Sequence, residues 1–127
     1  GAILGLMKIN LLKGNPSLAN DLFMSFTASK EYNDAEKLVP AIKSMSEMLD
    51  KKLLTENDLD VAFASSVRLI SRGNIYASID GLMDILRQDK RYRKDKAKRV
   101  LLSLLELIDP EGEQIRLYRT ELATILF

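Results

Sequence analysis

Apolar residues recur every three or four positions along almost the whole chain. This spacing is typical of amphipathic α-helices, whereas strands would alternate apolar and polar side chains. Glycines and prolines fall mostly between the periodic segments, where turns are expected. The pattern therefore predicts an all-α chain of about seven helices, over residues 2–13, 16–26, 34–52, 58–72, 75–88, 94–109 and 113–127.

One predicted helix contains a proline in its interior, at Pro40. An interior proline removes a backbone hydrogen bond, and its ring clashes with the preceding turn, at a cost of about 3 kcal/mol. Either the segment 34–52 kinks at this residue or its regular part begins near Val39. The sequence leaves both possibilities open.

A short motif occurs twice, each time between two predicted helices. A Gly-Asn pair begins at Gly14 and again at Gly73, and a small residue follows five positions after each glycine, at Ala19 and Ser78. Glycine adopts the left-handed conformation of a helix end at the least cost. A small residue lets two helices approach closely. This repetition predicts antiparallel helical hairpins that stack on one another.

These steps resemble tetratricopeptide repeats, in which a Gly-Asp/Asn-x-x-x-Ala sequence joins the two helices of a pair. The resemblance implies that the hairpins stack as a short right-handed array that binds other proteins. Two pairs lie near the lower limit of about three repeats for a stable solenoid. A capping last helix or a homodimer is therefore expected to cover the remaining apolar edge.

The whole chain also resembles one particular group of proteins. It has a Leu-Gly-Leu-Met helix at 4–7, an Arg-Gln-Asp sequence at 87–89 and a final Tyr-Arg-Thr-Glu-Leu-Ala-Thr-Ile-Leu-Phe segment at 118–127. This order is similar to the C-terminal tetratricopeptide-like region of bacterial thioredoxin-domain co-chaperones, the chaperedoxin family. The resemblance implies a preceding thioredoxin-like domain, so that the chain, which starts without Met, is a C-terminal fragment. It also implies that the helices hold protein partners or unfolded clients and support delivery to larger chaperones.

Composition narrows the classes of function. The chain has 127 residues, enough for a single domain over 1–127, with no Cys and no His. Thiol nucleophiles, histidine bases and zinc sites built from Cys or His are excluded, so we expect no enzyme, cofactor or metal site. Paired carboxylates such as Asp58/Asp60 and Asp80/Asp84 are expected to be solvated. No apolar run approaches the roughly 20 residues of a membrane span, and the expected location is the cytoplasm.

The densest charge feature is the stretch 87–99, with eight basic and two acidic residues, although the net charge of the chain is only +1. The candidate partner-binding residues there are Arg91, Arg93, Lys94 and Lys98. Three interpretations remain open: a solvated surface, a site for an acidic protein partner, or a phosphate-binding site in which Tyr92 stacks on a base. The last would make the chain a nucleic-acid-binding domain, which the balanced overall charge disfavours.

The C-terminus carries an apolar stripe whose candidate partner-binding residues are Tyr118, Leu122, Leu126 and Phe127. Apolar side chains at a chain end usually pack into their own domain. Alternatively, the stripe inserts into a groove on another protein. A third class of function, a structural oligomerisation module, also remains open.

Overall fold

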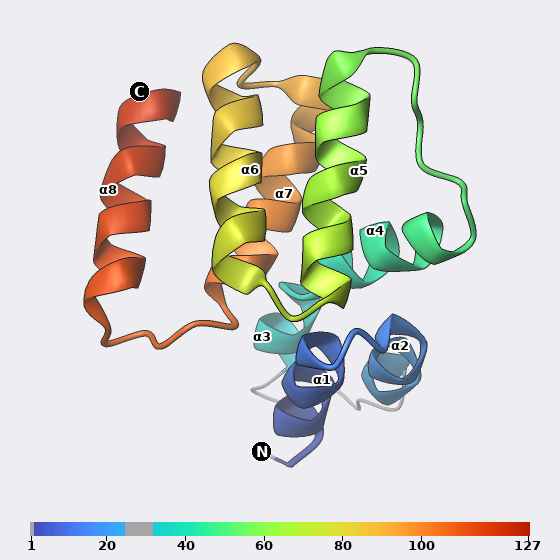
Figure 1. The fold of residues 1–127 in the computed structure, drawn as a ribbon. Coiled ribbons are helices and arrows are strands. Elements are labelled where there is room, and N and C mark those ends of the chain that lie inside the picture. The colour runs from blue at the N-terminus through green and yellow to red at the C-terminus, as the bar shows by residue number, and fades with distance from the viewer. Residues whose placement is uncertain (1, 25–31) are drawn as a thin grey trace.

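Eight helices and no strand make up the part of the chain that the structure describes, residues 2–24 and 32–127 of a computed structural model (Figure 1). The all-α prediction is confirmed. The helices are α1 (Ala2–Leu12), α2 (Pro16–Met24), α3 (Tyr32–Glu36), α4 (Val39–Leu49), α5 (Asp58–Ser71), α6 (Ile75–Gln88), α7 (Tyr92–Leu105) and α8 (Glu113–Leu126).

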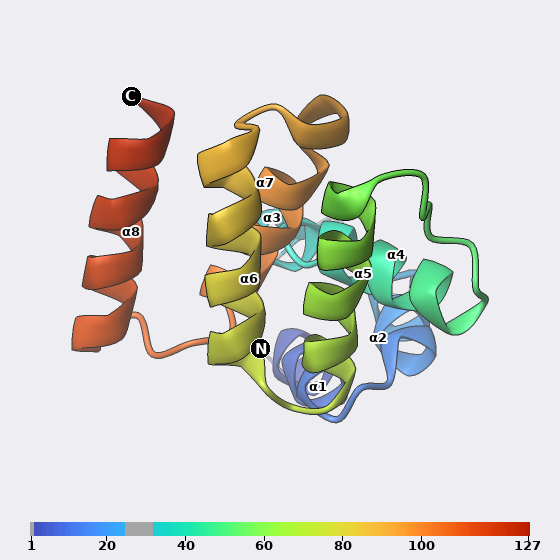
Figure 2. The ribbon, with the colours of Figure 1, turned by 45° about the horizontal axis from the view of Figure 1, so that its top comes forward.

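The helices pack as neighbouring antiparallel hairpins, as the repeated motif predicts. Helices α1 and α2 form one hairpin, and α5 and α6 form the most closely packed one. Helix α7 lies against both α6 and α4, while α8 stands beside α6 on the side away from α5 (Figure 2). No helix in the described part of the chain is both long and apolar enough to cross a membrane.

Glycine forms the corner of both repeated hairpins. Gly14 has φ of +73° and Gly73 has φ of +78°, the left-handed conformation that side chains disfavour. The small residues five positions later, Ala19 and Ser78, have no exposed surface. The Ser78 hydroxyl donates to the backbone carbonyl of Ser66 at 2.7 Å, so the second hairpin is joined by a hydrogen bond as well as by close packing.

The predicted helix 34–52 is divided in two. Helix α3 ends at Glu36, and α4 begins at Val39 with Pro40 in its first turn, where the missing N–H has no intrahelical partner. The alternative in which the regular helix begins near Val39 is therefore confirmed. Leu49, the last residue of α4, is 56% exposed.

Gly81 lies on the side of α6 that packs against α5. A Cβ at this residue would lie 2.4 Å from the Ser66 hydroxyl oxygen on α5. The glycine therefore permits the close approach of the two helices, and its cost in helix propensity is offset by packing.

Helix α7 lies between two neighbours, α4 and α6. Its core side chains are Val100, Leu101, Leu104 and Leu105, and all are buried. The helix ends at Leu105, four residues earlier than the predicted limit at Asp109. Leu102 faces outward and is 38% exposed, so one face of the helix remains open.

Candidate functional site

The first turn of α7 has an unusual backbone. Arg93, Lys94 and Asp95 have φ of 46°, 57° and 68°, so three consecutive residues are left-handed. For residues with a side chain, this conformation costs roughly 1–2 kcal/mol each. It persists only where surrounding contacts determine it. Contacts from neighbouring elements must therefore hold this turn in place.

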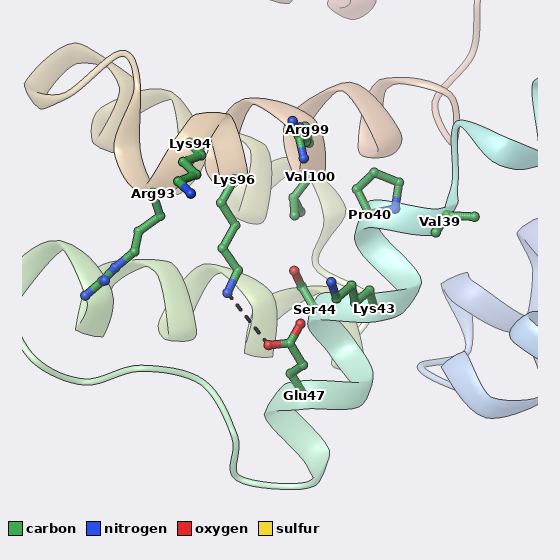
Figure 3. Close-up of a pocket in the computed structure, with 10 residues that line it drawn as sticks. All are labelled: Val39, Pro40, Lys43, Ser44, Glu47, Arg93, Lys94, Lys96, Arg99 and Val100. Carbon is green, nitrogen blue, oxygen red and sulfur yellow. Dashed lines mark ion pairs between the residues drawn. The ribbon is translucent and has the colours of Figure 1, made fainter.

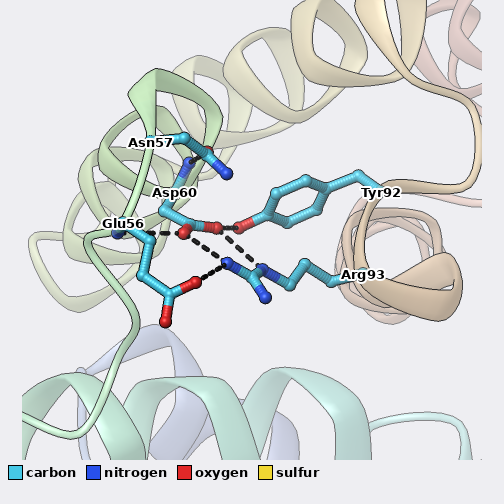
Figure 4. A network of polar contacts seen from close by, with 5 residues as sticks. All are labelled: Glu56, Asn57, Asp60, Tyr92 and Arg93. Carbon is cyan, nitrogen blue, oxygen red and sulfur yellow. Dashed lines mark hydrogen bonds and ion pairs between the residues drawn. The ribbon is translucent and has the colours of Figure 1, made fainter.

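Asp60, in the first turn of α5, supplies those contacts (Figure 4). It has no exposed surface, and its carboxylate accepts a hydrogen bond from the Tyr92 hydroxyl at 2.5 Å. Its two oxygens also accept from Arg93, from Nε at 3.0 Å and from Nη2 at 2.7 Å. The Glu56 backbone N–H donates to the same carboxylate at 3.1 Å. The fork of the guanidinium thus fixes the position of the left-handed turn.

The protonation states in this network follow from its contacts. The hydrogen bonds from Arg93 hold the pKa of the Asp60 carboxyl well below its usual range, although burial opposes the shift. Burial, reinforced by the neighbouring Asp60 carboxylate, raises the pKa of the Tyr92 hydroxyl. At neutral pH the network therefore contains an ionised carboxylate and a neutral phenol.

Asp60 and Tyr92 are both buried, contrary to two expectations from the sequence. Asp60 was expected to be solvated, but it is fully buried because Tyr92 and Arg93 cover it. Tyr92 was a candidate for stacking on a base, but only 4% of it is exposed and its ring packs on Phe63, with centroids 5.6 Å apart. It is unavailable to a nucleic acid.

A cavity of about 450 Å³ lies between α4 and α7, next to this turn (Figure 3). We call it the basic groove. Val39, Pro40 and Val100 form the apolar part of its lining. The charged side chains that line it are Lys43, Glu47, Arg93, Lys94, Lys96 and Arg99. Its volume lies within the roughly 300–1,000 Å³ of ligand-holding clefts.

Some of these charges are compensated within the protein. Lys96 reaches across the groove from α7 to Glu47 on α4, 3.7 Å away, and its ammonium lies 5.3 Å from the centre of the Phe63 ring (Figure 3). Arg93 is paired with Asp60 and Glu56, at 2.7 and 2.9 Å. These five polar residues and the Phe63 ring are thus committed to internal contacts.

Three cations in the groove have no such contact. Lys43, Lys94 and Arg99 are exposed, and none has a carboxylate partner among the described residues. Cations gathered on the walls of one cleft reinforce one another's potential. The groove therefore attracts anions.

A second cavity, of about 360 Å³, continues from the basic groove toward α8. Pro40 and Arg99 line both cavities, so the two share a boundary. The second cavity is also lined by the exposed Leu102 and by Arg119 of α8. Together the cavities follow the outward face of α7.

The structure places the basic sequence candidates in different surroundings. Arg93 and Lys94 line the groove, whereas Arg91 and Lys98 do not. The Arg91 side chain is 82% exposed and lies 3.6 Å from the Asp95 carboxylate. Lys43 was not predicted as a site residue, because it is far from the basic stretch in sequence and because no sequence pattern indicates that α4 packs against α7.

The C-terminal candidate residues also differ in burial. Tyr118 and Leu122 are buried in the protein's own core, Leu126 is half-buried, and Phe127 is fully exposed. The Tyr118 hydroxyl donates to the Asp80 carboxylate on α6 at 3.1 Å. Burial, together with this carboxylate, raises the pKa of Tyr118 to about 12.

An ion pair also holds α8 against α6. The guanidinium of Arg87 on α6 is paired with Glu121 on α8 and with Asp84 on its own helix. Within residues 2–24 and 32–127, no group of three or more acidic side chains is arranged to hold a metal ion. Among the described residues, the basic groove combines unpaired cations with an apolar lining.

Stacked helical hairpins with an open groove define a class of helical-repeat proteins that bind other proteins. Residues 39–127 match the Tetratricopeptide repeat family, and the chain belongs to that family. Its repeats are typically non-catalytic modules for protein–protein interaction. Neither the curated proteins nor the solved structures that were searched contain a match to the chain.

Proposed function

We propose that this chain is the partner- or client-binding helical region of a thioredoxin-like co-chaperone and that it holds protein segments in the basic groove. The observation that carries the proposal is the set of unpaired cations, Lys43, Lys94 and Arg99, around a cleft with an apolar lining. A polypeptide can satisfy both, because its side chains carry carboxylates and apolar groups along one backbone.

The co-chaperone part of the proposal rests on the resemblance of residues 4–7, 87–89 and 118–127 to the chaperedoxin family. In that family these helices follow a thioredoxin-like domain in bacterial proteins. The exposed Phe127 at the end of α8 supports a second contact, in which the chain end docks on a larger chaperone. A bacterial cytoplasmic setting belongs to the same proposal.

The experiment measures binding of a permanently unfolded protein, such as reduced and alkylated α-lactalbumin, by fluorescence anisotropy. We expect binding to the unfolded protein and not to its native form. Arg99→Glu should weaken binding because it reverses a groove cation. Lys90→Glu is the matched control, since Lys90 lies in the same basic stretch, is exposed and does not line the groove.

Equal affinity of the two variants for the unfolded protein would contradict the proposal. Titrations with DNA and RNA at two salt concentrations test the nucleic-acid alternative, since phosphate binding weakens steeply with salt. Light scattering tests the structural alternative, a homodimer with no other partner. Tight nucleic-acid binding that Arg99→Glu abolishes, without binding of the unfolded protein, would replace the proposal.

A further inference from the structure

We infer that the ligand of the basic groove is an extended, acidic peptide segment in which side-chain carboxylates flank an apolar residue. The inference rests on the proposed function and specifies the chemistry of the partner. It is argued from three features of the cleft: the position of its unpaired charges, the composition of its lining and its continuation along α7.

The unpaired charges lie on both walls of the groove. Lys43 projects from α4, while Lys94 and Arg99 project from α7 (Figure 3). A single small anion would meet only part of this set. A segment that carries at least two carboxylates can neutralise cations on both walls, and complementary potentials of this kind favour correct partners and exclude basic ones.

The apolar lining favours a ligand that carries an apolar group as well as charges. Val39 and Pro40 are half-buried, and Val100 is buried at the base of the cleft. An aliphatic side chain placed against these groups would remove apolar surface from water, at roughly 25 cal/mol per Å². A ligand with only carboxylates would leave this apolar surface exposed to water. The segment therefore needs an apolar residue between its acidic ones.

The second cavity explains why the segment is extended. Because Pro40 and Arg99 border both cavities, a ligand can pass from one to the other along α7. Leu102, which is 38% exposed, offers a further apolar contact there, and Arg119 offers a further cation. An extended chain advances about 3.3 Å per residue and turns successive side chains to opposite sides, which suits alternating contacts of this kind.

The same lining disfavours a nucleic acid. No aromatic side chain lines either cavity among the described residues, so bases have no stacking surface. Glu47 and Glu106 also border the two cavities, where each lies within ion-pair distance of a lysine, Lys96 at 3.7 Å and Lys37 at 3.9 Å. A peptide can place its uncharged residues opposite these carboxylates.

The position of the groove wall depends on the anchored turn. Lys94 lies in the left-handed segment that Arg93 and Asp60 hold in place, so its backbone position is set before any ligand arrives. A preorganised wall lowers the ordering cost of binding. Asp60 is therefore a positioning residue, without contact to the ligand.

The test uses fluorescein-labelled octapeptides with blocked ends and alternating Glu and Leu, titrated against the whole chain by fluorescence anisotropy. One control peptide has Gln for each Glu, and another has Ser for each Leu. We expect each control peptide to bind at least about tenfold more weakly, a difference of about 1.4 kcal/mol in binding free energy. The affinity of the acidic peptide should also fall between 50 and 200 mM salt, because screening shortens the reach of exposed charges.

Charge-reversal variants test whether the peptide binds in the basic groove. Arg99→Glu on α7 and Lys43→Glu on α4 should each weaken the acidic peptide about tenfold. Lys90→Glu, with the same change of charge outside the groove, should alter the affinity by less than about twofold. Both target residues are exposed and unpaired, so the variants are expected to fold, which far-UV circular dichroism checks.

The outcomes separate the inference from the proposed function. If the Gln peptide binds as well as the Glu peptide, the inference is overturned. If no peptide binds but Arg99→Glu still weakens binding of the unfolded protein, the inference fails and the proposed function stands. If Arg99→Glu and Lys43→Glu alter neither peptide nor unfolded-protein binding, both fail.

Discussion

Gly14 lies directly against the backbone of Ser71, so that a Cβ at position 14 would be 2.5 Å from the Ser71 carbonyl oxygen. The corner of the first hairpin thus abuts the end of α5, which leads into the corner of the second. A Cβ at Gly73, in that second corner, would lie 3.9 Å from the carbonyl oxygen of Leu12. The two corners fit together, and the tighter contact is at Gly14.

Gly14→Ala is expected to destabilise the protein by more than about 2 kcal/mol. The left-handed conformation alone costs roughly 1–2 kcal/mol for alanine, and the new methyl group also forces the Ser71 backbone to move. Gly5→Ala is the matched control, because nothing lies near that position and alanine favours a helix interior by about 0.5–1 kcal/mol. Urea denaturation measures both, and a Gly14→Ala protein as stable as the wild type would contradict the geometry.

Gly81→Ala should destabilise the packing of α5 on α6 by about 1–2 kcal/mol, since overpacking outweighs the gain in helix propensity. The Ser66 hydroxyl causes the clash, so Ser66→Ala should restore most of the lost stability in the double variant. A double-mutant cycle by chemical denaturation is expected to give a coupling of about 0.5–3 kcal/mol. Additive effects of the two substitutions would show that the residues do not meet.

Asp60→Asn is expected to cost about 1.5–3 kcal/mol, because it removes the buried charged group that accepts hydrogen bonds from Tyr92 and Arg93. Glu56→Gln removes the more exposed pair with Arg93, 2.9 Å apart, and should cost less than about 1 kcal/mol. Guanidinium denaturation at pH 7 compares them. Similar values for the two variants would mean that burial does not distinguish the pairs.

The acid branch of the stability curve tests the same network. Below pH about 4 the unfolded chain protonates Asp60, while the folded protein, whose Asp60 pKa is held well below that value, does not. The free energy of unfolding therefore falls as the pH is lowered, and the contribution is lost once the folded carboxyl also protonates. Asp60→Asn should show a shallower fall than the wild type between pH 4 and pH 2.

At alkaline pH the sign is reversed for Tyr118. The unfolded tyrosine ionises above pH about 10, whereas the folded one, with its pKa raised to about 12, stays neutral. Stability should therefore fall between pH 10 and 12 by up to about 1.4 kcal/mol per pH unit. Tyr118→Phe should reduce this slope but retain the part due to Tyr92, and parallel curves for wild type and variant would refute the assignment.

Phe127→Ala should leave the free energy of unfolding within about 0.5 kcal/mol of the wild type, because the side chain is fully exposed. Leu122→Ala, on the same stripe but buried, should cost about 2–5 kcal/mol. Thermal and chemical denaturation compare the two. If Phe127→Ala proved as destabilising as Leu122→Ala, the chain end would be part of the core and its proposed docking role would be withdrawn.

Local chemistry made much of the fold predictable. The bounds of α6 follow from Gly73 before it and the apolar spacing within it, and Asn57 caps α5 by accepting from the Asp60 N–H at 2.9 Å. The glycine corners and the small residues after them also have the predicted roles. These features depend on neighbours within a few residues, which a sequence displays directly.

The groove was less predictable because it depends on contacts between distant segments. The basic stretch pointed to Lys94, but Lys43 enters the site only because α4 packs against α7. The burial of Asp60 depends on Arg93, 33 residues away. The three left-handed residues at 93–95 follow from that contact, and no local propensity indicates them.

The remote anchor at Asp60 affects how mutational surveys of binding should be interpreted. Loss of its carboxylate would release the turn that carries Lys94, and affinity would fall although the residue touches no ligand. A survey that measures affinity alone would assign Asp60 to the recognition surface. Only a parallel measurement of folding would show that Asp60 acts by holding the backbone of the groove in position.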